Sequence, residues 1–448
     1  MKRSLALATD LYELTMAAAY FVNRVAATAT FELFVRELPH TRGYLIAAGL
    51  EQALEYLHDL RFSAEDIAYL QRHPSFQAIP ASFFDFLRAL RFSGEVWAIP
   101  EGTPVFQNEP LVRVTAPIIE AQIVETALLA TINLQTMVAS KAARVVAAAA
   151  GRDVIEFGSR RAHGTEAALY AARAAYVGGC SGTSNVEAGR RFDVPTSGTM
   201  AHSWVMTFDD EVAAFERYAA VFPHTMTLLI DTYDTEAAAR KLVAAGLRPL
   251  AVRLDSGDLD RLSRSVRRIL DAGGLPTTRI FASGDLDEWR IAELVAAGAP
   301  VDAFGVGTRL ATSLDQPALG GVYKLVELVV DHEVHGKIKT STGKATFPGR
   351  KQIWRRSDPR GAYLEDIVAL ADEDGPAEAE PLLVCVMQGG RALAPPPPLA
   401  GVRARCLRLV NRLAPALRDL DAPAAYPVRV SDRLADAQRK LVAAWIGR

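Results

Sequence analysis

The feature that most constrains the fold is an alternation of apolar runs and helix-forming segments between residues 153 and 307. The apolar runs are DVIEF, NVEAGRRF, TMTLLID, PLAVRLD, RIFASGD and VDAFGVG, and segments such as TEAAARKLVAAG and LDRLSRSVRRILDAG separate them. Alternation of this kind is typical of βα units around a parallel sheet. We therefore expect the centre of the chain to form a parallel sheet with covering helices.

Polar and small residues gather where the chain leaves these predicted strands. The strand ends read LLIDTYD, AVRLDSGD, IFASGD and AFGVGT. In a β/α barrel the carboxyl ends of the strands build the active site. An open doubly wound sheet usually carries a GxGxxG turn after its first strand, and we find no such turn, so the pattern favours a barrel.

The segments on either side of this region have a different pattern. Residues 4–120 mix helices, at about 10–21, 49–60 and up to 90, with the strand TATFELFVRE and a small antiparallel sheet between 94 and 117. Residues 117–151 predict one long buried helix. Beyond residue 321 we expect the strand GVYKLVELVV, a loop in which Lys339, Lys344 and Lys351 form a solvated face, and two final helices.

Composition excludes several classes of function. The net charge of −2 offers no broad field for nucleic acid or an anionic membrane, so neither is expected as a partner. Cys180, Cys385 and Cys406 are too few and too far apart for a disulfide framework or a CxxC zinc site. Asp10 and Glu13 interrupt the first apolar run, and no window has 18 uncharged apolar residues. These features predict a cytoplasmic protein.

The stretch from Glu156 to Trp204 is the most probable ligand site in the sequence. It contains five arginines and two histidines, and two of the arginines and both histidines lie next to a glycine or serine. Loop N–H groups and cationic side chains of this kind converge on anions. Phosphate is therefore the first ligand to expect.

Ten short motifs, in this order, resemble the nicotinate phosphoribosyltransferase family. They are TDLYELTM, EFGSRRAHG, GGCSGTSN, GTMAHSWV, IDTYDT, VRLDSGD, SGDLDE, FGVGT, GVYKLVEL and GKATFPGRKQIWR. The resemblance implies an irregular β/α barrel of the quinolinate phosphoribosyltransferase type, with an additional α+β domain built from N-terminal and C-terminal segments. The corresponding ranges are an N-terminal domain at 1–120, the catalytic barrel at 121–320, and a returning segment at 321–448.

The resemblance also implies an activity. Members of the family join nicotinate to 5-phosphoribosyl 1-pyrophosphate, which gives nicotinate mononucleotide and pyrophosphate, the first step of NAD salvage from nicotinate. They couple this step to ATP hydrolysis through a phosphorylated histidine, use Mg²⁺, and usually form a homodimer with shared active sites. The role of residues 370–448 does not follow from the sequence.

His202, in GTMAHSW, matches the phosphorylated histidine of the family. A neutral imidazole in a polar loop is a nucleophile near neutral pH and accepts a phosphoryl group. The alternative is a core histidine that a backbone carbonyl satisfies. The matching motif favours the catalytic interpretation.

Two aromatic residues match positions where the family stacks on the pyridine ring. Phe157 and Gly158 match the strand end that binds nicotinate, and Arg160 reaches phosphate or ribose there. Tyr12 resembles the ring that the partner subunit supplies. Each aromatic residue has a simpler interpretation, as core packing for Phe157 and as one face of an amphipathic helix for Tyr12.

Thr183 and Ser184 fall where related nicotinamide phosphoribosyltransferases carry an acidic residue. A carboxylate there would repel the carboxylate of nicotinate, whereas a hydroxyl donates to it. This difference favours nicotinate over nicotinamide. Both residues are alternatively ordinary loop residues.

Two strand ends bring carboxylates and a cation together. The residues predicted to hold ribose, Mg²⁺ and the substrate anion are Asp231, Arg253, Asp255, Ser256 and Gly257, with Asp231 and Asp255 as catalytic residues and Mg²⁺ near Asp255. Departing pyrophosphate needs a metal and cations, and a developing ribosyl cation needs nearby negative charge. Asp258 is instead interpreted as a helix N-cap.

The remaining predicted residues form a cradle for the 5-phosphate. They are Gly284, Asp285, Gly305, Gly307 and Thr308. Glycines let backbone N–H groups approach phosphate oxygens, although a tight turn explains them equally well. The main hypothesis is an ATP-dependent nicotinate phosphoribosyltransferase. The alternatives are the nicotinamide or quinolinate enzymes and a non-catalytic barrel that binds phosphoribosyl ligands.

Overall fold

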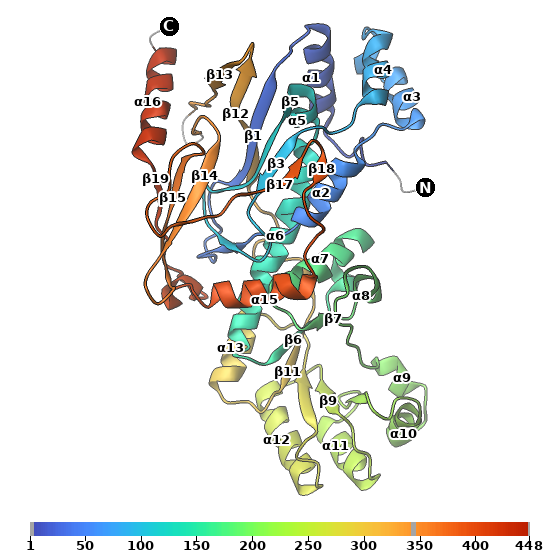
Figure 1. The fold of residues 1–448 in the computed structure, drawn as a ribbon. Coiled ribbons are helices and arrows are strands. Elements are labelled where there is room, and N and C mark those ends of the chain that lie inside the picture. Colours follow the sequence, from blue (N-terminus) through green and yellow to red (C-terminus); the bar gives the residue numbers. More distant parts are fainter. Residues whose placement is uncertain (1–3, 342–345, 447–448) are drawn as a thin grey trace. The chain divides into compact units, whose positions relative to one another are not determined.

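The computed structural model describes residues 4–341 and 346–446 and divides into two compact units (Figure 1). Unit 1 consists of three chain segments, Met1–Thr136, Ala318–Pro398 and Arg408–Arg448, and unit 2 of Met137–Pro317 and Leu399–Leu407. The three sequence ranges given above stay a prediction of the domain division. Lys344 lies outside the described residues.

A seven-stranded antiparallel sheet dominates unit 1, in the order β13-β12-β1-β5-β3-β17-β18. Its strands are β1 Thr28–Val35, β3 Glu95–Ala98, β5 Pro110–Pro117, β12 Gly321–Val330, β13 Glu333–Gly336, β17 Val384–Gln388 and β18 Arg391–Ala392. The sequence predicted a separate small sheet at 94–117. Its two main strands, β3 and β5, instead join the large sheet, because β1 is buried at seven of its eight positions and pairs with β5 and β12.

Smaller sheets and helices complete unit 1. The sheets pair β2 Leu45–Ile46 with β4 Pro104–Val105, and join β16 Glu380–Pro381, β14 Lys351–Ser357, β15 Tyr363–Leu370 and β19 Val428–Val430. The helices are α1 Leu11–Val22, α2 Leu50–Asp59, α3 Ala64–Arg72, α4 Ala81–Ala89, α5 Ile118–Ile123 and α16 Asp432–Ile446. The predicted helices at 10–21 and 49–60 are confirmed.

The predicted helix over 117–151 is two helices, α5 and α6 Glu125–Ala148. Val124 ends α5 with φ −95° and ψ −3°. The N–H of Thr126, at the start of α6, donates to the Glu13 carboxylate of α1 at 3.0 Å. A new helix start is stable there because a carboxylate satisfies one of its free N–H groups.

Lys351 corrects the prediction of a solvated lysine face. Its side chain is 6% exposed and pairs with the fully buried Glu32 at 2.8 Å. Burial lowers the pKa of Lys351, and the charge of Glu32 opposes that shift. Because β14 begins at this residue, Lys351 is part of the core of unit 1.

Unit 2 contains the predicted parallel sheet, in the order β7-β6-β11-β10-β9-β8. Its strands are β6 Asp153–Glu156, β7 Gly182–Thr183, β8 Thr227–Leu229, β9 Ala251–Leu254, β10 Arg279–Ala282 and β11 Ala303–Val306. Every pair in this sheet is parallel, which confirms the βα interpretation. The sheet is a curled half-barrel with β7 and β8 at its edges.

Helices follow the strands of unit 2. They are α7 Thr165–Val177, α8 Val186–Phe192, α9 His202–Met206, α10 Glu211–Val221, α11 Thr235–Ala244, α12 Leu259–Ala272, α13 Glu288–Ala296, α14 Thr308–Ala311 and α15 Leu399–Val410, which extends into unit 1. NVEAGRRF, which is one of the apolar runs expected to form strands, forms the helix α8 instead. The Asn185 side chain caps it through the Ala188 N–H, and Ala188 and Phe192 bury one face.

Within the described part of the chain, no helix is long and apolar enough to cross a membrane.

Candidate active site

A cavity of about 740 Å³ lies where the strands of the unit 2 sheet end. Its lining residues belong to the ends of β9 and β11, follow β6, β7, β9, β10 and β11, or precede α9. They are Phe157, Ser159, Arg160, Arg161, Ser184, Gly198, Thr199, Arg253, Asp255, Ser283, Gly284, Asp285, Gly305, Gly307 and Thr308. This is the edge of a parallel sheet at which α/β proteins bind their ligands.

Most of the predicted site residues line this one cavity. They are Phe157, Arg160, Ser184, Arg253, Asp255, Gly284, Asp285, Gly305, Gly307 and Thr308. Thr183, His202, Asp231, Ser256 and Gly257 are not among the lining residues. Asp231 accepts a hydrogen bond from the lining residue Asp255, and His202 lies 3.9 Å from the same carboxylate. Thr183 precedes the lining residue Ser184, and Ser256 and Gly257 follow Asp255.

Arg253 is fixed from three sides at the cavity wall. Its Nη2 donates to Asp255 at 2.5 Å, its Nε to Ser283 Oγ at 2.8 Å, and its Nη1 to Thr199 Oγ1 at 3.0 Å. Sequence reasoning missed Ser283 and Thr199. Both stand inside quoted motifs, SGDLDE and GTMAHSW, but nothing in a hydroxyl residue's identity shows that it orients an arginine.

Asp255 is held as an anion in the cavity. Burial disfavours its charged form, but the Ser283 hydroxyl, which donates at 2.5 Å, and the Arg253 charge together lower the pKa of Asp255. The carboxylate is 24% exposed. A fixed negative charge at this position stabilises positive charge that develops on a bound ligand.

Asp231 lies behind Asp255 and has one free oxygen. Its Oδ2 accepts the Asp255 N–H at 3.0 Å and the Ser256 hydroxyl at 2.6 Å. Its Oδ1 is buried and has no hydrogen-bond partner. An unpartnered buried carboxylate oxygen is costly unless a water or a cation binds it.

These two aspartates fit the requirements of Mg²⁺. The ion is commonly held by one or two carboxylates together with substrate phosphates. Among the described residues, no group of three or more histidine, cysteine or carboxylate side chains is placed to hold a metal. Asp231 and Asp255 therefore suit an ion that a phosphate ligand helps to bind.

His202 begins the short helix α9 beside this carboxylate pair. Its Nε2 lies 3.9 Å from Asp255 Oδ2, and its Nδ1 lies 3.2 Å from the Thr232 hydroxyl. The side chain is 42% exposed. The core interpretation of this histidine is therefore wrong, because the imidazole is open to solvent and oriented by a hydroxyl and a carboxylate.

Phe157 presents its ring to the cavity between a cation and a second ring. The Arg253 guanidinium carbon lies 5.5 Å from the ring centroid, and the Phe281 centroid lies 5.5 Å away on a tilted ring. A Cβ at Gly305 would come within 2.7 Å of the Phe157 ring. Gly305 therefore makes room for Phe157, a role that the phosphate-cradle hypothesis did not include.

The loop after β10 needs glycine for a second reason. Gly284 has φ +94°, and a Cβ there would meet the Asp255 carbonyl oxygen at 1.9 Å. The next residue, Asp285, also has a positive φ of 47°. The loop thus lies tightly against the end of β9 and turns its backbone toward the cavity.

Thr183 and Ser184 occupy different places. Ser184 lines the cavity, and its N–H donates to the Glu156 carbonyl at 3.0 Å. Thr183 is fully buried, and its hydroxyl donates to the Glu156 carboxylate at 2.6 Å. The hydroxyl of Ser184, rather than that of Thr183, is therefore exposed to a ligand.

Tyr12 belongs to unit 1, on α1, and is 45% exposed. Its hydroxyl is hydrogen-bonded to Glu125. Burial, followed by the charges of Glu125 and Glu13, raises the pKa of the Tyr12 phenol. The side chain is thus a neutral aromatic donor on the surface of unit 1.

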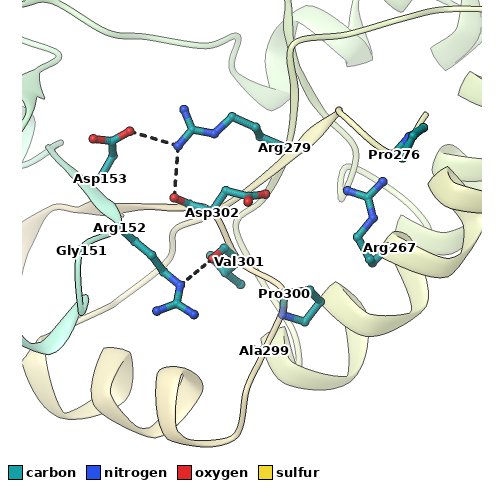
Figure 2. A pocket seen from close by; sticks show the side chains of 10 residues that line it. All are labelled: Gly151, Arg152, Asp153, Arg267, Pro276, Arg279, Ala299, Pro300, Val301 and Asp302. Atoms are coloured by element: carbon teal, nitrogen blue, oxygen red, sulfur yellow. Dashed lines mark hydrogen bonds and ion pairs between the residues drawn. The ribbon is translucent and has the colours of Figure 1, made fainter.

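A second cavity, of about 420 Å³, lies at the opposite ends of the unit 2 strands (Figure 2). Arginines line it, but each is already engaged. Arg279 pairs with Asp153, Arg152 donates to the Val301 carbonyl, and Arg267 donates to two carbonyls and Asp271. These contacts fix the loops that lead into β6, β10 and β11, so the cavity has a structural explanation.

Known proteins resemble this chain over most of its length. The family models for nicotinate phosphoribosyltransferase (NAPRTase) match as the N-terminal domain at 7–133, the NAPRTase family at 153–353 and the C-terminal domain at 375–438. The nicotinate phosphoribosyltransferase pncB2 of Mycobacterium tuberculosis is 49% identical, over 96% of this chain and 92% of the relative. The nicotinate phosphoribosyltransferase of Bacillus subtilis is 44% identical, over 83% of this chain and 77% of the relative.

Solved structures give the same result. The crystal structure of human nicotinic acid phosphoribosyltransferase matches with a TM-score of 0.85 and 32% identity, over 97% of this chain and 99% of that one. The nicotinate-nucleotide pyrophosphorylase of Pyrococcus furiosus matches with a TM-score of 0.72 and 26% identity, over 91% and 95%. The resemblance seen in the sequence motifs is thereby confirmed, and the chain is an enzyme that belongs to the nicotinate phosphoribosyltransferase family.

Proposed function

We propose that this enzyme forms nicotinate mononucleotide and pyrophosphate from nicotinate and 5-phosphoribosyl 1-pyrophosphate, coupled to ATP hydrolysis, in NAD salvage. The observation that supports this proposal most is the set of side chains that line one cavity. It combines the Phe157 ring, the Arg160 and Arg253 guanidinium groups and the Asp255 carboxylate, with His202 Nε2 3.9 Å from Asp255. Family relatives that carry the same activity in their names support it further.

The ring of nicotinate stacks on Phe157, and its carboxylate binds a nearby cation. Arg253 suits that role, because three hydrogen bonds hold its guanidinium in one orientation. A ring held by stacking and by its carboxylate presents the pyridine nitrogen to ribose C1 in a fixed direction. Such alignment lowers the barrier by replacing a random encounter with a bound geometry.

The ribosyl group develops positive charge as its bond to pyrophosphate breaks, and the pyridine nitrogen forms the new bond to C1. Asp255, whose pKa is lowered, keeps its negative charge near this centre. The backbone around Gly284, Gly305 and Gly307 holds the 5-phosphate, and the Arg160 guanidinium adds a cationic contact. Asp231 and Asp255 would hold Mg²⁺, which neutralises the charge of the departing pyrophosphate when bound.

In this proposal an imidazole nitrogen of His202 bonds to the γ-phosphorus of ATP, the bond to the β–γ bridging oxygen breaks, and ADP leaves. The imidazole is open to solvent, and Thr232 and Asp255 orient it. His202 Nε2 lies 3.9 Å from Asp255 Oδ2, so a phosphorylated His202 would be close to the carboxylates that would hold Mg²⁺. Hydrolysis of that phosphohistidine after product formation would couple ATP use to the reaction.

Nicotinate is favoured over nicotinamide at Ser184. The Ser184 side chain lines the cavity, and its hydroxyl would donate a hydrogen bond to the carboxylate of nicotinate, whereas the NH₂ group of nicotinamide needs an acceptor there.

A homodimer completes the site in this proposal. The exposed aromatic ring of Tyr12 on unit 1 would stack on the pyridine in the partner's cavity.

The test is product formation by the wild-type enzyme and His202→Ala with nicotinate, nicotinamide or quinolinate, each with and without ATP. We expect kcat/KM to be highest with nicotinate and ATP to stimulate only the wild type. Radiolabelled ATP should leave an acid-labile phosphoprotein only when His202 is present. Ser203→Ala, the adjacent change, is the matched control and should keep the stimulation.

Each failure has a distinct meaning. Preference for nicotinamide or quinolinate would reject the interpretation of Ser184. ATP stimulation that persists in His202→Ala would reject the role of His202. Neither product nor phosphoprotein from the wild type would favour a non-catalytic barrel that binds phosphoribosyl ligands.

A further inference from the structure

Glu156 is a buried carboxylate behind the candidate active site, and the proposed reaction does not use it. It is the last residue of β6 and only 1% exposed. One of its oxygens accepts the Gly158 N–H, and the other accepts the Thr183 hydroxyl at 2.6 Å. Burial raises the pKa of Glu156, and these two hydrogen bonds oppose the rise.

The groups around Glu156 show which hydrogen bonds its two carboxylate oxygens accept. A backbone N–H such as that of Gly158 only donates. The Thr183 oxygen already accepts the Asn185 N–H at 3.0 Å, so its own hydrogen is directed to Glu156. Both carboxylate oxygens therefore accept a hydrogen bond, one from Gly158 and one from Thr183.

The two partners of Glu156 lead into different loops of the cavity, because Gly158 lies in the loop after β6 and Thr183 is the last residue of β7. Gly158 follows Phe157, whose ring faces the cavity, and Thr183 precedes Ser184, whose side chain also lines it. The main chain repeats the connection, because the Ser184 N–H donates to the Glu156 carbonyl at 3.0 Å. Asn185 adds a third link through its bond to Ser159 Oγ at 3.0 Å.

Gly158 has no room to move away from this carboxylate. A Cβ there would lie 2.3 Å from Ala311 Cβ and 2.7 Å from the Gly307 carbonyl oxygen. The turn is thus enclosed by α14 and the end of β11. The loop at Thr183 is held on its other side by Pro195 and Ser197, which bond its backbone N–H and carbonyl.

We propose that Glu156 is a positioning residue that sets the spacing between the Phe157 ring and Ser184, and so the affinity for the pyridine substrate. This role rests on the proposed function, in which Phe157 stacks on nicotinate and Ser184 binds its carboxylate. Glu156 acts through both loops and does not touch the ligand, since it is absent from the cavity lining. Without the Glu156 carboxylate, the segment that carries Phe157 is no longer bonded to the Thr183 side chain next to Ser184.

The kinetic test uses three variants of the full chain. Glu156→Ala removes the carboxylate, Thr183→Val removes only the hydroxyl donor, and Thr183→Ser keeps it. We expect the first two to raise KM for nicotinate about tenfold or more, because each breaks the buried hydrogen bond between Glu156 and Thr183 that joins the two segments. KM for 5-phosphoribosyl 1-pyrophosphate should rise less than KM for nicotinate, kcat should change less than about twofold, and Thr183→Ser should keep the wild-type values.

Hydrogen exchange of the ligand-free protein gives a second measurement that does not depend on turnover. In Thr183→Val, peptides covering 156–162 and 181–186 should exchange faster than in the wild type, whereas Ser184→Ala should leave the 156–162 peptide unchanged. Faster exchange across the whole chain would show a general structural role and overturn the proposal. The same holds if kcat falls and both KM values rise to a similar extent.

The remaining outcomes are separable. An unchanged KM for nicotinate in Thr183→Val overturns the proposal even if the enzyme is active. If the wild type forms no nicotinate mononucleotide, the proposed function fails first. The exchange measurement then decides whether Glu156 joins the two loops, and unchanged exchange would reject that connection as well.

Discussion

Single residues of the site are required for reasons that their type alone does not reveal. Gly284 and Gly305 were both predicted to cradle a phosphate. Gly284 is required by a backbone conformation with φ +94°, and Gly305 by the ring of Phe157. A sequence shows that a glycine is present, whereas the contact that a Cβ would make depends on segments far away in the chain.

Gly284→Ala should destabilise the protein by more than about 2 kcal/mol, because the new Cβ would be 1.9 Å from the Asp255 carbonyl in a conformation that L residues rarely adopt. The matched control is Gly298→Ala, where φ is +68° and nothing lies within 4 Å. That change should cost about 1 kcal/mol from backbone strain alone. Denaturant unfolding measures both, and equal losses would contradict the contact argument.

Asp255 predicts a dependence of stability on pH. Its pKa in the folded state is lowered: burial opposes this, but the Ser283 hydrogen bond and the Arg253 charge outweigh it. The resulting stability is present above the ordinary aspartate pKa of about 3.9 and is lost as the pH falls through the lower folded value. Asp255→Asn should lack this component.

The measurement is the free energy of unfolding of both proteins between about pH 3 and pH 6. We expect the wild type to lose stability more steeply at the acidic end, so that the two curves converge there. Parallel curves over the whole range would show that Asp255 is not a source of the pH dependence.

At the scale of elements, the three connections that lead into α11, α12 and α13 divide their aspartates between two tasks. Asp234, Asp258 and Asp287 cap α11, α12 and α13 by accepting the N–H three residues later. Asp231, Asp255 and Asp285 stand two or three residues earlier and belong to the site or its support. The interpretation of Asp258 as a helix cap is therefore confirmed.

Asp258→Ala should cost about 1 kcal/mol of stability and leave both KM values unchanged, because the lost hydrogen bond serves only the start of α12. Asp255→Ala, three residues earlier, should instead reduce kcat/KM strongly. Thermal unfolding and steady-state kinetics of the two variants check this division. A raised KM in Asp258→Ala would place that carboxylate in the site.

The long periodic elements were predictable from the sequence, and the short or context-dependent ones were not. Helices such as α1 and strands such as β1 and β9 to β11 have strong patterns that local physics fixes. The start of α6 depends on Glu13, more than 100 residues earlier. The half-barrel, rather than a closed barrel, depends on which strands find partners.

The candidate site likewise contains residues that could be predicted from the sequence and residues that could not. Phe157, Arg253, Asp255 and the glycines could be found because they stand in motifs at strand ends. Thr199 and Ser283, which orient Arg253, could not, because hydroxyl residues are frequent in every loop. The burial of Thr183 against Glu156 also required the three-dimensional pairing of β6 with β7.

At the scale of the whole molecule, the proposed homodimer can be tested by mixing two defective variants. Tyr12 belongs to unit 1, whereas Phe157 and Asp255 belong to unit 2. If a partner subunit supplies Tyr12, two variants with different defects should complement each other. One hybrid site then combines an intact cavity with an intact tyrosine.

Tyr12→Ala and Asp255→Asn should each be nearly inactive alone. After mixing under conditions that exchange subunits, about a quarter of the sites should be intact, so activity should recover to about a quarter of the wild-type value. The control is Tyr69→Ala, an exposed tyrosine on α3, which should be active by itself. No recovery in a mixture that native mass spectrometry shows to contain hybrid dimers would reject the shared site.

The division of unit 1 into three chain segments has a consequence for synthesis on the ribosome. Thr28 of β1 pairs with Val329 of β12, so about 300 residues must be translated before the large sheet gains this neighbour. At typical elongation rates the N-terminal strand waits roughly 15–60 s, with its apolar side chains open to other chains. Nascent chains that stall before β12 should therefore be unusually dependent on chaperones.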